Sequence, residues 1–77
     1  MNTRQLIENH QVCTEIIEGI EYFERAKRMA RENINGFAGS FPNLRKRYLH
    51  DLDIYGMCVE RLKLRYHKQM EQINKYL

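Results

Sequence analysis

The feature that most restricts the fold is a single cluster of helix-breaking residues near the middle of the chain. The sequence has 77 residues but only four glycines and one proline. Two of the glycines and the proline lie within residues 35–43, beside serine and asparagine. Such a cluster is typical of a turn. Each flank holds about 30 residues without proline, enough for a helix of about 45 Å.

The chain is therefore predicted to be all-α and to form one domain over residues 1–77. We expect a first helix at about 4–34, a turn at about 35–41 and a second helix at about 42–76, with boundaries good to a few residues.

Several residues near these boundaries have the chemistry of helix caps. Thr3 is a candidate N-cap of the first helix, and Gly36 suits the left-handed residue that follows many helix ends. Ser40 or Asn43 can cap the second helix, and Pro42 fits its first turn.

Apolar residues recur three, four or seven positions apart on both predicted helices, which is a near-heptad pattern. The first stripe consists of Leu6, Cys13, Ile16, Ile17, Ile20, Phe23, Ala30 and Ile34. The second consists of Tyr48, Leu52, Tyr55, Val59, Leu62, Tyr66, Met70, Ile73 and Leu77. When the chain folds back at the turn, facing residues have numbers that add up to about 79. The predicted pairs include Cys13 with Tyr66, Phe23 with Tyr55, and Ala30 with Leu49. The stripes face each other throughout, which predicts a long antiparallel, coiled-coil-like helical hairpin.

A hairpin of this size buries little surface, so we expect it to dimerise into a four-helix bundle. Apolar residues away from the core stripes support a second contact surface. They are Tyr22 and Met29 on the first helix and Ile54, Met57 and Leu64 on the second. A different protein partner at this surface is the alternative.

Charge is distributed unevenly along the chain, although the formal net charge is only +3. Residues 5–24 hold five glutamates and no lysine or arginine, whereas residues 61–75 hold five cations and one glutamate. The hairpin places these two segments side by side, which favours the antiparallel register.

Cations and aromatic residues gather around the turn, and we call this set the basic turn. It comprises Arg25, Arg28, Arg31, Phe37, Phe41, Arg45, Lys46, Arg47 and Tyr48. Cations near the end of the first helix complement its dipole, whereas those at the start of the second helix oppose it. The basic turn suits an acidic protein surface. RNA or DNA is the alternative, since cations neutralise phosphates and aromatic rings stack on unpaired bases. Simple solvation of the charges is the third interpretation.

We expect structural roles for the glycines within the helices and for the cysteine and histidine residues. Gly19 and Gly56 would lie near each other and leave room for aromatic rings, and a bend that a partner exploits is the alternative. Cys13, His10 and His67 lack the close spacing of a zinc motif, and Cys13 and Cys58 are out of register for a disulfide. No metal or cofactor is therefore expected.

No catalytic motif occurs in the sequence, so we expect a non-enzymatic protein-interaction module, regulator or inhibitor. Its size is also that of small regulators of phages and mobile elements. No apolar run approaches the roughly 18 residues of a membrane span, and the N-terminus lacks the apolar stretch of a signal peptide. The expected location is the cytoplasm, without a membrane partner.

Overall fold

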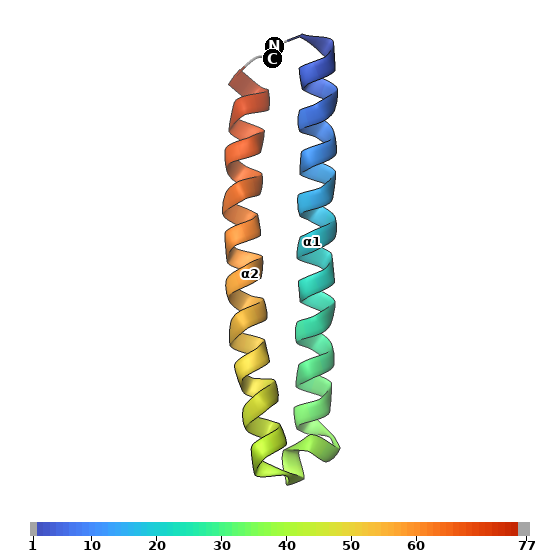
Figure 1. The fold of residues 1–77 in the computed structure, drawn as a ribbon, viewed down its shortest axis with the longest axis vertical. Coiled ribbons are helices and arrows are strands. Elements are labelled where there is room, and N and C mark those ends of the chain that lie inside the picture. Colours follow the sequence, from blue (N-terminus) through green and yellow to red (C-terminus); the bar gives the residue numbers. More distant parts are fainter. Residues whose placement is uncertain (1, 76–77) are drawn as a thin grey trace.

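Two long antiparallel helices form the protein in a computed structural model that describes residues 2–75 (Figure 1). Helix α1 spans Thr3–Asn35, a short 3-10 helix, η1, spans Phe37–Ser40, and helix α2 spans Pro42–Lys75. The rod measures 56 × 14 × 12 Å, with the turn at one end and both the start of α1 and the end of α2 at the other. The predicted hairpin and helix starts are confirmed. The expected helix end at 76 and the stripe residue Leu77 lie outside the described residues.

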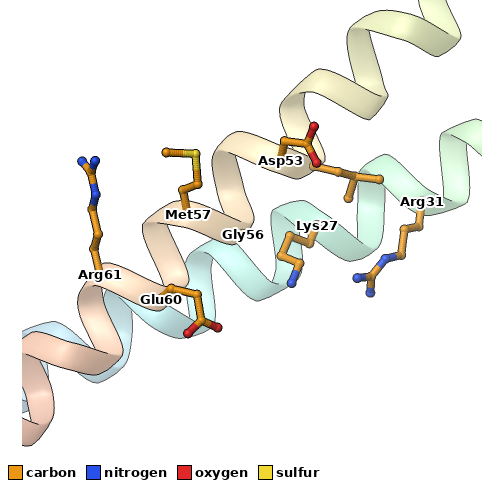
Figure 2. Close-up of a pocket in the computed structure, with 8 residues that line it drawn as sticks. Lys27, Arg31, Asp53, Gly56, Met57, Glu60 and Arg61 are labelled. Carbon is orange, nitrogen blue, oxygen red and sulfur yellow. The ribbon is translucent and has the colours of Figure 1, made fainter.

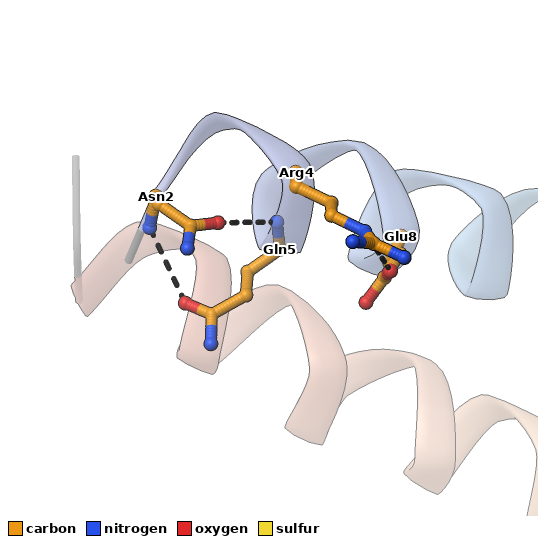
Figure 3. Close-up of polar contacts among 4 residues, drawn as sticks. All are labelled: Asn2, Arg4, Gln5 and Glu8. Carbon is orange, nitrogen blue, oxygen red and sulfur yellow. Dashed lines mark hydrogen bonds and ion pairs between the residues drawn. The ribbon is translucent and has the colours of Figure 1, made fainter.

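The start of α1 is held by a reciprocal cap (Figure 3). The Oδ1 atom of Asn2 accepts a 2.9 Å hydrogen bond from the Gln5 N–H, and the Gln5 Oε1 atom accepts a 3.2 Å bond from the Asn2 N–H. In the same part of α1, the Arg4 side chain forms an ion pair at 3.3 Å with Glu8, one turn along the helix. The predicted cap, Thr3, is instead the first helical residue, because Asn2 already satisfies the free N–H groups there.

The turn differs from the prediction in its backbone. Gly36 has φ −95°, so it is not left-handed, and its N–H donates a 2.9 Å hydrogen bond to the Glu32 carbonyl. The 3-10 helix that follows buries Ala38 completely. A Cβ on Gly39 would collide with the Ile34 carbonyl oxygen, so this turn requires glycine for close packing.

Helix α2 begins at Pro42, as its fixed φ and missing N–H allow. The Phe41 carbonyl accepts a 2.9 Å hydrogen bond from the Arg45 N–H and thereby starts the helical ladder. The side chains of Ser40 and Asn43 make no hydrogen bond within residues 2–75, so neither acts as the predicted cap.

The core is a single seam along the rod. Its buried members are Cys13, Ile16, Ala30, Ala38, Val59 and Ile73. The other described stripe residues are half-buried, except Ile17, which is 41% exposed. Ile17 is therefore a correction to the first stripe, since it lies at the edge of the seam. Lys27, which interrupts the stripe, is half-buried and keeps its ammonium beside Glu24 at 4.0 Å.

The predicted register is confirmed at two levels of the hairpin. Phe23 and Tyr55 place their ring centroids 6.0 Å apart, and the Gln69 side-chain amide donates a hydrogen bond to Asn9 Oδ1. Two other pairs differ from the predicted register: the partner of Cys13 is shifted by about one helical turn, and that of Ala30 by one position.

These differences lie at Cys13 and Ala30. The Sγ atom of Cys13 lies 3.9 Å from Met70 Sδ, one turn beyond the predicted Tyr66. Ala30 shares a groove with Tyr48, while Leu49 is 44% exposed. Helical side chains lean toward the N-terminus of their helix, so contacts shift from the position that numbering alone predicts.

The rod leaves much of its surface exposed. Its accessible area is 6235 Å², whereas a folded monomer of 9.4 kDa typically exposes about 5,000 Å². Within residues 2–75, neither helix is long and apolar enough to cross a membrane.

Candidate binding site at the basic turn

Helix α1 contributes three exposed arginines to the basic turn. Arg25, Arg28 and Arg31 are spaced three residues apart, and they line an open groove of about 550 Å³ with Glu21 and Glu24 among its other residues. The last turn of α1 holds no basic residue, although every residue of that turn is described. The helix dipole therefore does not account for these cations, contrary to the sequence-based interpretation, because its effect falls off within one turn.

Helix α2 contributes the cations closest to the turn. Arg45, Lys46 and Arg47 follow directly after the first three residues of the helix, and all three are exposed. The partial positive charge at a helix N-terminus repels cations. This effect falls off within the first turn, so it acts on Arg45, the fourth residue of α2, whereas Lys46 and Arg47 lie just beyond it.

None of these six cations has an ion-pair partner among residues 2–75. The ion pairs in this part of the chain are Arg4 with Glu8 and Lys27 with Glu24, both within α1. The acidic and basic segments at the open end also form no ion pair between helices in this range, so their complementarity acts only through the longer-range field. The basic turn presents unsatisfied positive charge to solvent.

Exposed aromatic rings lie among these charges. Phe37 and Phe41 are 63% and 56% exposed, and their centroids lie 6.3 Å apart at an interplanar angle of 65°. Phe41 also lines a hollow of about 440 Å³, together with Pro42, Asn43, Leu44 and Arg47. An apolar floor with an arginine among its walls can hold an apolar side chain next to a carboxylate.

The structure changes the membership of the predicted site at two residues, since Tyr48 leaves it and Leu44 joins it. Tyr48 is half-buried and lies against α1 in a small groove with Ala30, so it supports the turn rather than forming its surface. Leu44 was missed, although its position beside Pro42 and next to three consecutive cations was a usable signal.

Comparison with protein-family models, curated proteins and solved structures found no match to this chain. The functional interpretation therefore follows from the geometry of the chain itself.

The off-stripe apolar residues are exposed, and two of them border different grooves. Met29 lines a groove of about 200 Å³ with Asp51 and Tyr55. Met57 instead borders a different groove, of about 630 Å³, and projects from α2 away from α1 (Figure 2). The exposed fractions are Tyr22 60%, Met29 62%, Ile54 42%, Met57 57% and Leu64 63%. Met29 and Met57 therefore border different grooves, whereas Tyr22, Ile54 and Leu64 border neither of the two.

The two glycines within the helices differ in their surroundings. A Cβ on Gly19 would meet Leu62 Cδ1 at 3.2 Å, and a Cβ on Gly56 would meet nothing within 4 Å. Phe23 packs against Tyr22 and Tyr55. Packing between α1 and α2 therefore does not explain why residue 56 is a glycine.

The thiols and imidazoles are dispersed. Cys13 is buried, Cys58 is half-buried, and both are free thiols. Across the described part of the chain, no three His, Cys, Asp or Glu side chains come together as metal ligands could.

Proposed function

We propose that this protein is a non-enzymatic binding module whose basic turn docks on an acidic surface of another protein. The observation that carries the proposal is that Arg45, Lys46 and Arg47, which are exposed and have no ion-pair partner among residues 2–75, follow closely on the exposed rings of Phe37 and Phe41. Cations that oppose a helix dipole are expected where they serve binding rather than folding. Charge then steers and orients the partner.

A protein partner agrees best with the hollow beside Phe41. Phe41, Pro42 and Leu44 offer apolar contact, and Arg47 supplies a planar donor for a carboxylate. A short acidic segment with one apolar side chain would meet both needs. Such a mixture of an apolar centre and a charged rim is typical of protein interfaces.

A nucleic acid is the second candidate. The arginine content and the exposed phenylalanines support it, since phosphates bind arginine and unpaired bases stack on aromatic rings. Its affinity would fall steeply with salt.

The module is also proposed to act as a homodimer that forms a four-helix bundle. The area exposed beyond that of a typical monomer of this mass, about 1,200 Å², resembles what each partner buries in a stable interface, about 800 Å². A dimer would present two basic turns.

The experiment is a nuclease-treated pull-down from the source organism with three tagged baits. The wild type is compared with Arg45→Glu/Arg47→Glu and with the control Lys63→Glu/Arg65→Glu, which changes the net charge equally at exposed sites away from the turn. We expect an acidic protein that the wild type and the control retain and the turn variant loses. Recovery by all three baits, or by none, would contradict the proposal.

A nucleic-acid target has a different signature. In that case the recovered material disappears after nuclease treatment, and purified RNA or DNA binds with an affinity that falls steeply between about 50 and 200 mM salt. This outcome would replace the protein partner with the second candidate.

A further inference from the structure

One face of α2 carries a pattern that is complementary to itself. Asp53, Met57 and Arg61 are spaced four residues apart, so they form one stripe along the helix, with a rise of about 6 Å between neighbours. All three are exposed, and all border the groove of about 630 Å³ (Figure 2). Neither Asp53 nor Arg61 has an ion pair among residues 2–75. We call these three residues the α2 stripe.

We infer that the α2 stripe is the contact between two copies of this chain, packed antiparallel about a twofold axis at Met57. This inference rests on the dimer part of the proposed function and adds its face and its direction. Reversing one copy places Asp53 opposite Arg61 of the second copy, and the symmetry repeats that pair on the other side of Met57. A parallel arrangement would place like charges opposite each other.

The glycine beside Met57 supports the same face. Gly56 costs about 1 kcal/mol relative to alanine within a helix. Packing between α1 and α2 does not require it, because a Cβ there would meet no atom within 4 Å apart from its chain neighbours and the backbone of its own helix. A residue without a side chain lets a second helix approach closely, and the groove beside it has room for the Met57 side chain of the second copy.

The distribution of charge at the ends of the rod favours the same direction. Three cations of the basic turn, Arg45, Lys46 and Arg47, lie within the first six residues of α2 and so at the turn end of each rod. Antiparallel packing places the two basic turns at opposite ends of the pair, whereas parallel packing would bring them together. The rod exposes about 1,200 Å² more surface than a typical monomer of its mass, and this excess is enough for such a contact.

The test is sedimentation equilibrium of charge-reversal variants of the full chain, with circular dichroism to confirm that each is helical. Asp53→Arg and Arg61→Asp should each weaken the dimer at least tenfold, because each replaces two attractive pairs by two repulsive ones. Asp53→Arg/Arg61→Asp should restore the wild-type dissociation constant to within about threefold. Glu18→Arg, which changes the charge as Asp53→Arg does at an exposed site on α1, should leave it unchanged.

Two more variants test the direction and the glycine. Asp53→Asn should weaken an antiparallel dimer and would strengthen a parallel one. Gly56→Ala should weaken the dimer severalfold while leaving helicity the same or higher, since the hairpin itself accommodates the methyl group.

Each result has a distinct meaning. A wild type that sediments as a monomer would overturn both the dimer and this interface. A dimer that tolerates Asp53→Arg, or that the double reversal does not restore, would overturn only this interface. A dimer strengthened by Asp53→Asn would overturn the antiparallel direction.

Discussion

The side-chain amide of Gln69 donates a hydrogen bond to Oδ1 of Asn9, which precedes it by sixty positions in the chain. The two residues are half-buried and lie near the open end of the hairpin, far from the turn. A polar pair in an apolar seam holds one register, because a shift of either helix separates the two groups. The turn and this pair therefore fix the alignment of α1 and α2 at both ends.

Substitution of this pair should separate stability from register. Gln69→Leu should lower the free energy of unfolding by about 1 kcal/mol, since it leaves the Asn9 amide without this hydrogen bond. Asn9→Leu/Gln69→Leu should recover that loss but allow other alignments of the helices. Urea denaturation measures the first effect, and the number of amide peaks in an NMR spectrum measures the second. A double variant less stable than Gln69→Leu would contradict this role.

Gly39 should tolerate no side chain, in contrast to Gly19. Gly39→Ala forces a methyl group against the Ile34 backbone carbonyl, and we expect a loss of about 1–3 kcal/mol. Gly19→Ala meets only the flexible end of Leu62, so the gain in helix propensity should offset the contact and leave stability within about 0.5 kcal/mol. Thermal unfolding of both variants is the measurement. Equal losses in the two would show that the turn does not depend on close packing at Gly39.

Arg45, at the end of the first turn of α2, should lower the free energy of unfolding. Arg45→Glu replaces a charge that opposes the helix dipole, so it should raise the free energy of unfolding by about 0.3–1 kcal/mol at low salt. Lys63→Glu, an exposed substitution in the middle of the same helix, should give no such gain. Urea denaturation at about 20 and 500 mM salt tests this, because salt should reduce the difference. A destabilised Arg45→Glu protein would indicate a structural role for Arg45.

The two thiols should react at different rates in the folded protein. Cys13 is 4% exposed and lies in the seam against Met70, whereas Cys58 is half-buried. A thiol reagent should therefore modify Cys58 first and Cys13 only as the hairpin opens. The Cys58→Ser and Cys13→Ser variants assign the two phases. Two thiols of equal rate without denaturant would contradict the burial of Cys13.

The sequence was sufficient for the hairpin because long-range periodicity decides it. The position of the glycine-proline cluster and the phases of two stripes converge on one register, which Phe23 and Tyr55 confirm. Local backbone details were not predictable in this way. Asn2 takes the cap expected at Thr3, and Gly36 avoids the left-handed conformation, because differences of one residue depend on competing local hydrogen bonds.

The candidate site was predicted in composition but not in arrangement. Sequence alone located the cations of the basic turn, whereas the burial of Tyr48 and the hollow at Leu44 depend on how α2 leaves η1. Helical wheels also joined Met29 and Met57 into one interface, although the two border different grooves. The periodicity of one helix does not reveal toward which side of its neighbour a residue points.

The placement of Arg45, Lys46 and Arg47 at one end of a thin rod affects how an antiparallel pair would bind. Met57 lies about 22 Å from the start of α2, so pairing there would hold two basic turns about 45 Å apart and facing outward. Such a pair is bivalent. It could bridge two acidic surfaces at that spacing, and avidity would make it selective for partners that are themselves repeated or clustered.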